Sequence, residues 1–273
     1  MSGISETIEL LGKGLYTGIP DVLTLKSIPT ASELEYVGAE DFDKTMIEKI
    51  LPASVEEKID FYQLLDVDYR WICRCLRIVN YGPYYTTDRI LCSDCGKISW
   101  GEYQVNLNTV GCKTIPEGFK NPFTIEADRF IDQKYPVEMV LPTIKMTMDA
   151  MNDKAFQTAD GTVNRDLARL CYTIKSIAGK TNLTPVEIKL IIQNEFTAAD
   201  YLLLKDTAYE LSDFGIRMGG KAQCPKCGSM DATFIAFSDD RFFRPTVGNL
   251  LQWKADRSKR EDEDTAGASA ATV

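Results

Sequence analysis

The sequence contains two copies of the motif C-x-x-C-G, and their separation restricts the possible folds more than any other feature. The first copy lies in "LCSDCGKISW" (residues 91–100) and the second in "QCPKCGSMDATFIAF" (residues 223–237). The two-residue spacer brings both sulfurs of a knuckle to one ion at about 2.3 Å, and the glycine allows a positive φ. A stand-alone ribbon has about 15–20 residues between its knuckles. Here 128 residues separate Cys95 from Cys224, so the motifs predict a site that joins distant parts of the chain.

The two motifs together predict a structural zinc. The four expected ligands are Cys92, Cys95, Cys224 and Cys227. Four thiolates complete the tetrahedral shell of zinc and leave no position for water or substrate, which favours a structural role over a catalytic one. Such a zinc contributes on the order of 10–16 kcal/mol of binding free energy to folding. We therefore expect it to clamp an inserted domain at its base, and the loss of any one thiolate to loosen the whole insertion.

A single C-x-x-C motif has two other interpretations, a pair of incidental or buried cysteines and a thioredoxin-type redox pair that opens a helix. Neither explains a matched second copy with its own glycine. Cys73 and Cys171 fall on apolar faces of predicted helices and Cys75 lies near one, so all three are expected to be small hydrophobic residues. Cys112, in "TVGCKT", is the one substitute ligand that the sequence offers.

The composition argues against an enzyme and against a nucleic-acid partner. Histidine is absent from the 273 residues, which removes His-based triads, His general bases and zinc sites with an imidazole ligand. No pair of carboxylate, lysine, tyrosine or cysteine side chains stands out as a catalytic couple. The net charge is −9 and the sequence pI about 4.8, so the surface is expected to repel phosphates. Hydrophobic residues make up 44% of the chain, enough for a sizeable core.

The sequence also predicts no association with a membrane. It has no run of the ~20 apolar residues that span a bilayer. The stretch "MSGISETIELLGKG" lacks the charged and apolar regions of a secretory signal. We therefore expect a reducing cytoplasmic setting, in which C-x-x-C pairs bind metal or perform redox work more often than they form structural disulfides.

The local patterns predict an α+β protein, and residues 1–90 form the first of its four parts. Residues 8–28 have strand-like ends around a turn rich in glycine and proline. Residues 30–51 follow a helical pattern. Ser54 and Glu57 have the spacing of a capping box, so we expect a long helix from there to the sequence "VNYGPYY".

The rest of the chain is expected to form a ribbon, an insertion and a tail. Residues 91–149 and 219–250 predict a zinc-ribbon and β region, in which "EYQVNL" and "YPVEMVLPTIKMTM" alternate like strands. Residues 150–218 predict an inserted helical subdomain with a helix over "NRDLARLCYTIKSIAGK" and two capped helices after it. The capping pairs are Thr184 with Glu187 and Thr197 with Asp200. Residues 251–273 are typical of a disordered tail.

Several of these motifs occur in an order that resembles one protein family. A glycine-and-tyrosine hairpin leads into a strand, a helix with an Asp-Arg-like pair runs into "LR…YG", and a C-x-x-C-G motif follows. The residues concerned are Gly14, Tyr16, Gly18, Pro20, Asp68, Arg70, Leu76, Arg77, Tyr81, Gly82, Cys92, Cys95 and Gly96. In this order the chain resembles the baseplate hub and hub-assembly proteins of T-even-type contractile-tailed bacteriophages, over residues 8–100 and more loosely at the second knuckle. It departs from the family in the split "DYR" and in the long insertion.

The resemblance implies a non-enzymatic component of the tail baseplate hub, or a tail-assembly factor, that docks onto other tail and baseplate hub proteins. It implies a location in the virion or, during assembly, in the host cytoplasm. An alternative is a zinc-ribbon accessory factor of transcription or replication that binds nucleic acid or polymerase. Such a factor is expected to carry a basic, aromatic-bearing face. Around both knuckles, however, Lys and Arg are balanced by Asp and Glu.

Two residue pairs on the predicted helix have structural interpretations. Asp68 and Arg70 are two positions apart, so they cannot pair with each other, and we expect each to make a surface or inter-domain contact. Arg77 and Tyr81 are four positions apart and are expected to stack and to brace the helix end against the ribbon.

Overall fold

The fold of the 273-residue chain is described from a computed structural model. The residues that the structure describes are 5–36, 39, 41–217, 219–235, 240–243, 248, 250–251 and 253–255. Helices are mixed with antiparallel sheets, which confirms the α+β class. Within the described ranges, no helix is both long and apolar enough to cross a bilayer.

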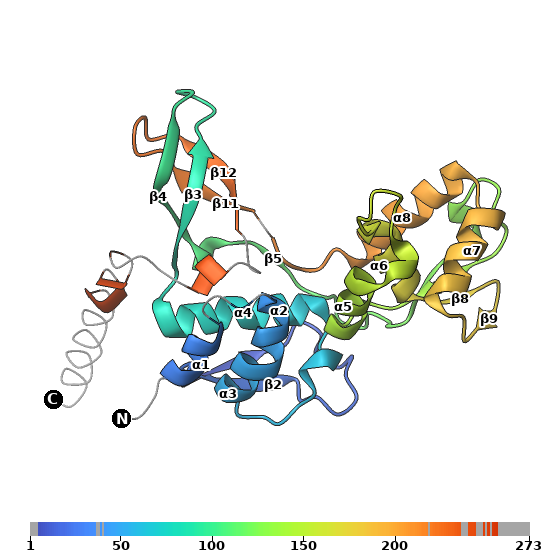
Figure 1. Cartoon of the computed structure of the whole chain (residues 1–273), viewed down its shortest axis with the longest axis horizontal. Helices are drawn as coiled ribbons and strands as arrows, with labels where there is room; N and C mark the ends of the chain where they lie inside the picture. Colours follow the sequence, from blue (N-terminus) through green and yellow to red (C-terminus); the bar gives the residue numbers. More distant parts are fainter. Residues whose placement is uncertain are drawn as a thin grey trace.

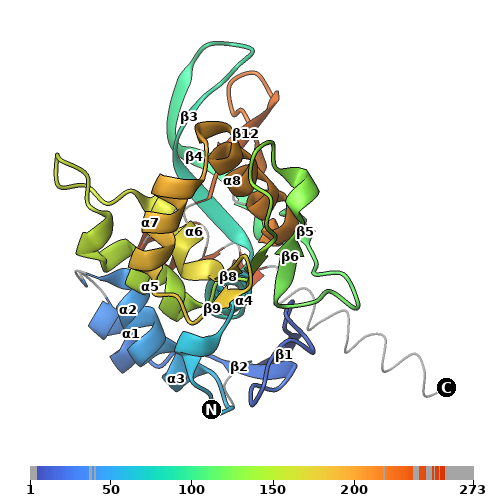
Figure 2. The ribbon, with the colours of Figure 1, turned by 90° about the vertical axis from the view of Figure 1, so that its right-hand side faces the viewer.

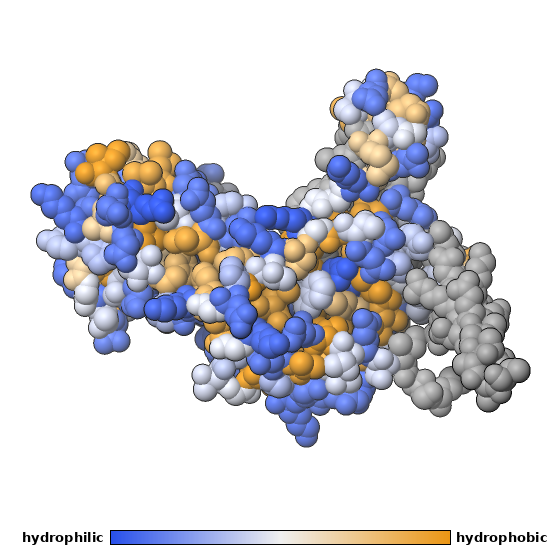
Figure 3. Space-filling model, turned by 180° about the vertical axis from the view of Figure 1, so that it is seen from behind, coloured by the Kyte–Doolittle hydropathy of each residue, from blue (hydrophilic) through white to orange (hydrophobic). Residues whose placement is uncertain are grey.

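Three parts of the molecule can be followed in Figure 1. They are a body (residues 5–83), a ribbon that projects from it (84–106 and 219–235), and an inserted lobe beside it (114–214). Figure 3, seen from behind, shows the ribbon and the inserted lobe as two projections with a hollow between them. Short 3-10 helices are η2 (Phe61–Gln63), η3 (Leu107–Thr109), η4 (Ala127–Arg129), η5 (Lys154–Phe156) and η6 (Asp240–Phe243).

The body begins with an antiparallel hairpin of β1 (Ser5–Glu9) and β2 (Val22–Lys26), as predicted for residues 8–28. Its inward-facing residues, among them Leu23 and Leu25, are buried in a first hydrophobic core. The helical segment expected over 30–51 is confirmed in part, because it consists of several short pieces. These are α1 (Thr30–Tyr36), α2 (Phe42–Thr45), the π-helical η1 (Met46–Ile50) and α3 (Leu51–Ser54).

The long helix of the body, α4 (Asp66–Tyr81), begins later than the sequence predicted. Ser54 is the last residue of α3 and does not cap a helix start. The carboxylate of Glu57 accepts a hydrogen bond from the Thr24 N–H at 2.9 Å instead. Glu57 of the expected capping pair therefore supports strand β2, and the long helix starts only at Asp66, after the short helix η2.

The end of α4 is fixed from inside by a buried arginine. Arg77 is fully buried, and its guanidinium lies 5.4 Å from the centre of the Tyr81 ring, which confirms the expected stacking. The guanidinium donates hydrogen bonds to three main-chain carbonyls, those of Phe242 (2.7 Å), Gly82 (2.6 Å) and Tyr84 (2.8 Å). Arg77 thus ties the start of the ribbon to a segment near the C-terminus.

The first described residues of the expected tail are helical. Residues 251 and 253–255 are in helical conformation. Trp253 lies so close to Gly82 that a Cβ on the glycine would sit 2.4 Å from the indole. The rest of the expected tail, residue 252 and residues 256–273, lies outside the described residues.

The ribbon consists of two antiparallel hairpins that pack on each other. β3 (Tyr84–Leu91) pairs with β4 (Ile98–Asn106), and β11 (Gly219–Gln223) pairs with β12 (Met230–Phe234). The hairpins come close at Gly220, where a Cβ would lie 2.7 Å from a methyl group of Val105. Figure 1 shows both hairpins extending away from the body, with their turns at the far end.

The chain enters and leaves the inserted lobe through a short two-stranded neck. β5 (Cys112–Lys113) pairs antiparallel with β10 (Gly215–Ile216). Gly215 has a φ of 95° and lies against the side chain of Val67 on α4, so the neck rests on the body. The base of the insertion is therefore closed by this strand pair. The expectation that the cysteines clamp the base is wrong, because they lie in the turns at the far end of the ribbon.

The inserted lobe contains a four-stranded antiparallel sheet as well as helices (Figure 2). The strand order is β6 (Phe123–Ile125), β7 (Val137–Met139), β8 (Ile174–Ile177) and β9 (Lys180–Thr181). The helices are α5 (Ile144–Asn152), α6 (Arg165–Thr173), α7 (Pro185–Glu195) and α8 (Ala198–Ser212). A second hydrophobic core joins residues 123–141 with residues 150–208. The lobe therefore begins well before residue 150, where the sequence placed its start.

Two segments of the inserted lobe differ from the predicted secondary structure. Residues 144–148, expected to continue a β pattern, start α5, because the Thr143 side chain accepts a hydrogen bond from the Met146 N–H at 3.3 Å. Residues 174–177, expected to extend a helix, form β8, because their main chain pairs with β7. Over so few residues a buried strand and a helical turn have the same apolar pattern.

The capping predictions for α7 and α8 are confirmed. Thr184 and Glu187 make both hydrogen bonds of a capping box. The Thr197 hydroxyl accepts from the Asp200 N–H at 3.1 Å. Burial raises the pKa of Asp200, but hydrogen bonds from the N–H groups of residues 131–133 and from the Thr197 hydroxyl outweigh it, so the pKa stays below its ordinary value. This carboxylate fixes the loop before β7 against α8.

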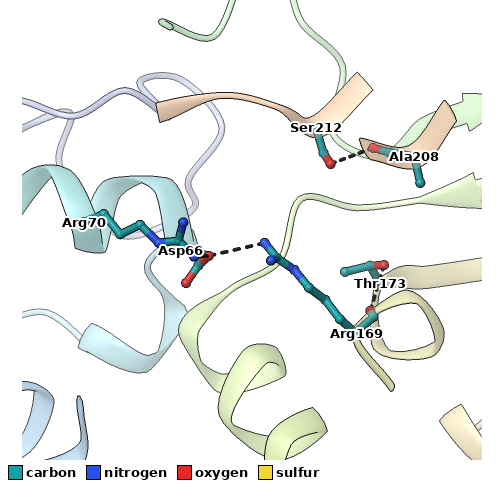
Figure 4. A network of polar contacts seen from close by, with 6 residues as sticks. All are labelled: Asp66, Arg70, Arg169, Thr173, Ala208 and Ser212. Carbon is teal, nitrogen blue, oxygen red and sulfur yellow. Dashed lines mark hydrogen bonds and ion pairs between the residues drawn. The ribbon is translucent and has the colours of Figure 1, made fainter. Parts of the chain in front are cut away.

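The body and the inserted lobe also meet in an ion-pair cluster at the start of α4 (Figure 4). The Asp66 carboxylate lies 2.7 Å from the Arg70 guanidinium and 3.3 Å from that of Arg169 on α6. The Asp66 N–H donates to the Pro142 carbonyl at 2.9 Å. Arg70 pairs with Asp66 on its own helix, and it is Asp66 that joins the body to the inserted lobe through Arg169.

Candidate metal centre

The structure brings the four cysteines of the two motifs together. The Sγ of Cys92 lies 3.5 Å from that of Cys227, and the Sγ of Cys95 lies 3.9 Å from that of Cys224. All four sulfurs lie within 4.8 Å of one another, and none of the four cysteines forms a disulfide. A disulfide would require about 2.05 Å. Four sulfurs at about 2.3 Å from one central ion stand about 3.8 Å apart, so the cluster is compatible with a metal site.

The same turn positions the thiols in both knuckles. The first cysteine donates its N–H to the carbonyl five positions later, and the glycine donates its N–H back to the first cysteine. These bonds join Cys92 to Lys97 (3.1 Å), Gly96 to Cys92 (3.0 Å), Cys224 to Ser229 (2.7 Å) and Gly228 to Cys224 (2.8 Å). Gly96 and Gly228 have φ values of 64° and 80°, the left-handed conformation that the motif predicted.

The four thiols differ in their exposure to solvent. Cys92 and Cys224 are each 1% exposed, Cys95 is half-buried, and Cys227 is exposed. Hydrogen bonds from the Ser229 hydroxyl and N–H hold the pKa of Cys227 below its ordinary value. The cluster therefore has a buried side within the ribbon and one open side at Cys227.

Ser229 is a polar neighbour of the cluster that the sequence analysis missed. Its Oγ lies 3.2 Å from the Sγ of Cys92 and 3.2 Å from that of Cys227, one thiol from each knuckle. The signal for this residue is its place directly after C-x-x-C-G, where the first knuckle has Lys97.

The other four cysteines lie outside the cluster. Cys73, Cys75 and Cys171 are buried, as expected of small hydrophobic residues. Burial raises the pKa of Cys75 and of Cys171 to about 12, so both remain thiols. Cys112, the substitute ligand that the sequence offered, lies in the neck as part of β5.

Apolar side chains are exposed next to the cluster. Leu91 and Ile98 are cross-strand partners at the ends of β3 and β4, and they are 61% and 40% exposed. Met230, the first residue of β12, is 58% exposed. All three directly flank the knuckles, so the far end of the ribbon combines the thiol cluster with an uncovered apolar surface.

Asp68, expected at the surface or between domains, is fully buried in the body. Its carboxylate accepts hydrogen bonds from the N–H groups of Leu11 and Gly12 and from the Tyr16 hydroxyl. Burial raises the pKa of Asp68 above its ordinary value, although these hydrogen bonds lower it. The pKa of Tyr16 is raised by burial and by this carboxylate, so the phenol stays protonated and donates a hydrogen bond to Asp68. Asp68 therefore holds the β1–β2 loop on α4.

Comparison of the chain with protein-family models, with curated proteins and with solved structures finds no match.

Proposed function

We propose that the chain is a non-enzymatic docking protein of a phage tail baseplate hub, either as a hub component or as an assembly factor. The observation that carries this proposal is the far end of the ribbon, where Leu91, Ile98 and Met230 are exposed beside the cysteine cluster. Exposed apolar residues gathered at a projecting end are typical of a protein–protein contact. The two packed hairpins present this end as a firm unit.

We further propose that the cluster holds a structural zinc. Its sulfur separations are close to those of a tetrahedral four-thiolate shell, and such a shell is typical of structural zinc. A two-stranded hairpin is at best marginally stable alone in water. A zinc between the two turns would hold both hairpins at the end where the proposed contact lies.

The assignment to the baseplate hub rests on the resemblance over residues 8–100, and several of the residues that carry it contact one another. The Tyr16 hydroxyl donates to Asp68, which joins the glycine-and-tyrosine hairpin to the helix. Arg77 donates to the carbonyls of Gly82 and Tyr84, which joins the helix end to the strand before the first knuckle. The motifs are therefore consecutive parts of one packed unit.

A second candidate is a zinc-ribbon accessory factor that binds nucleic acid or polymerase. It is favoured by Lys97, Lys221 and Lys226, which are exposed on the ribbon. The exposed Asp94 in the first knuckle and the overall charge of −9 weigh against it.

An affinity purification of the tagged full chain from its producing cells, with and without nuclease, tests both candidates. The ribbon variant is Leu91→Glu with Met230→Glu. A matched control, Leu202→Glu with Tyr209→Glu, changes two exposed apolar residues of α8. We expect the wild type and the control to recover tail or baseplate proteins regardless of nuclease, and the ribbon variant to lose them.

Other outcomes would redirect the assignment. Recovery of polymerase subunits, or of partners lost on nuclease treatment, would favour the second candidate. Equal recovery of tail proteins by the ribbon variant and the control would show that the far end of the ribbon is not the docking element.

A further inference from the structure

We infer that the Ser229 hydroxyl is a positioning group for the metal, donating a hydrogen bond to the cluster's thiolates and thereby increasing its affinity for zinc. The inference rests on the proposed zinc. Ser229 Oγ lies 3.2 Å from the Sγ of Cys92 and 3.2 Å from that of Cys227. These distances are within the range of hydrogen bonds to sulfur, and the two thiols belong to different knuckles.

The charge of the loaded site explains why such a donor matters. Four thiolates around Zn²⁺ carry a net charge of −2, and two of them, Cys92 and Cys224, are almost completely buried. A buried negative charge is costly unless it accepts hydrogen bonds. The Cys95 N–H is one donor, at 3.5 Å from the Sγ of Cys92. The Ser229 hydroxyl adds a shorter one.

The position of the hydroxyl also links the two knuckles. A hydroxyl has one proton, so it donates to one sulfur at a time, and from its present place it reaches either Cys92 or Cys227. Its main-chain carbonyl accepts from the Cys224 N–H at 2.7 Å, which fixes the residue within the second turn. Ser229 therefore holds a thiol of the first knuckle in register with the second.

The first knuckle provides a matched control. Lys97 occupies the equivalent position, because its carbonyl accepts from the Cys92 N–H as that of Ser229 does from the Cys224 N–H. Its side chain is exposed and carries no hydroxyl. Ser229→Ala removes the proposed donor, Ser229→Thr keeps it, and Lys97→Ala removes a side chain at the same place in the other turn.

The experiment is a competition titration of Zn²⁺ between a chelating dye and each purified full-length variant. We expect Ser229→Ala to weaken zinc binding by about tenfold or more, the usual effect of removing a group that supports a metal ligand. Ser229→Thr should restore most of the affinity, and Lys97→Ala should bind like the wild type. In Co²⁺-loaded protein, Ser229→Ala should move the sulfur-to-cobalt charge-transfer band to lower energy, because a thiolate without its hydrogen bond donates charge more readily.

Each other outcome overturns the inference. Unchanged affinity and an unchanged cobalt band in Ser229→Ala would overturn it while the proposed zinc site stands. Equal weakening by Ser229→Ala and Lys97→Ala would assign the effect to general loosening of the turns. A wild-type chain that binds no zinc would refute the proposed metal centre, and the role of Ser229 with it.

Discussion

If the cysteine cluster holds the proposed zinc, loss of that zinc is expected to release the ribbon and to leave the inserted lobe folded. The perturbation is Cys95→Ser, or chelation of the wild type. The cysteines lie in the ribbon turns, whereas the base of the lobe is closed by the pairing of β5 with β10 and by the contact of Asp66 with Arg169. Loss of the proposed zinc should therefore destabilise the ribbon and leave the lobe on the other side of the neck folded.

The expected magnitude follows from loop lengths. Cys95 and Cys224 are 129 positions apart. Cys112 already pairs with Ile216 in the neck. The proposed zinc therefore closes a loop made of only two segments, Cys95 to Cys112 and Ile216 to Cys224, about 25 residues in total. Loop-closure entropy grows as (3/2)RT ln n, so the shorter loop reduces the metal's contribution by about 1.4 kcal/mol relative to a closure of the whole insertion. The remaining contribution of the proposed zinc is expected to stabilise the ribbon alone.

Hydrogen–deuterium exchange with mass spectrometry is the assay. After Cys95→Ser or chelation, peptides from residues 84–106 and 219–235 should exchange faster. Peptides from residues 123–177 and 185–212 should keep their protection. Cys112→Ser, a cysteine outside the cluster, is the control and should leave the ribbon protected. If the lobe peptides lose protection together with the ribbon, the neck does not close the insertion and the reasoning fails.

Three further substitutions test the interior. Asp68→Ala leaves two N–H groups and a phenol without their acceptor, so it should lower the free energy of unfolding in urea titrations by about 3 kcal/mol; a loss below about 1 kcal/mol would contradict this account. Arg77→Leu removes the donor to three carbonyls and should lower the free energy of unfolding by about 3 kcal/mol or more, whereas Arg77→Lys should lower it less. Equal losses in the two variants would contradict this role of Arg77. The pKa of Asp200 is lowered in the folded protein, so its contribution to stability is present above the unfolded pKa of about 3.9 and is lost as the pH falls. The urea midpoint of the wild type should therefore drop more steeply between about pH 5 and pH 3 than that of Asp200→Asn. Parallel pH profiles would refute this assignment.

Features with a local cause could be predicted from the sequence. The C-x-x-C-G turns are formed within six residues, so the motif predicts both their shape and their glycine φ values. The capping box of Thr184 with Glu187 is likewise complete within four residues. The hairpin over residues 8–28 follows from its alternating pattern and its turn.

Features decided by distant partners could not be predicted. Ser54 and Glu57 have the spacing of a capping box, but Glu57 accepts a hydrogen bond from Thr24, which lies 33 positions earlier. Residues 174–177 continue a helical pattern, but β7 is available to pair with them. The same holds for the site, where the sequence identified four thiols that meet. The thiols lie away from the base of the insertion because a neck of two short strands closes that base instead. This strand pair has no sequence signature.

The distance between the knuckles also orders events during synthesis. Translation proceeds at about 5–20 residues per second, so the 128 residues between Cys95 and Cys224 take roughly 6–26 s to appear. Throughout that interval the nascent chain has only the first pair of the cluster's thiols, which is half of the proposed shell. A metal ion can be enclosed only after the lobe has been synthesised. Capture of the proposed metal at the ribbon would thus be a late event, possible only after the whole segment between the knuckles has been synthesised.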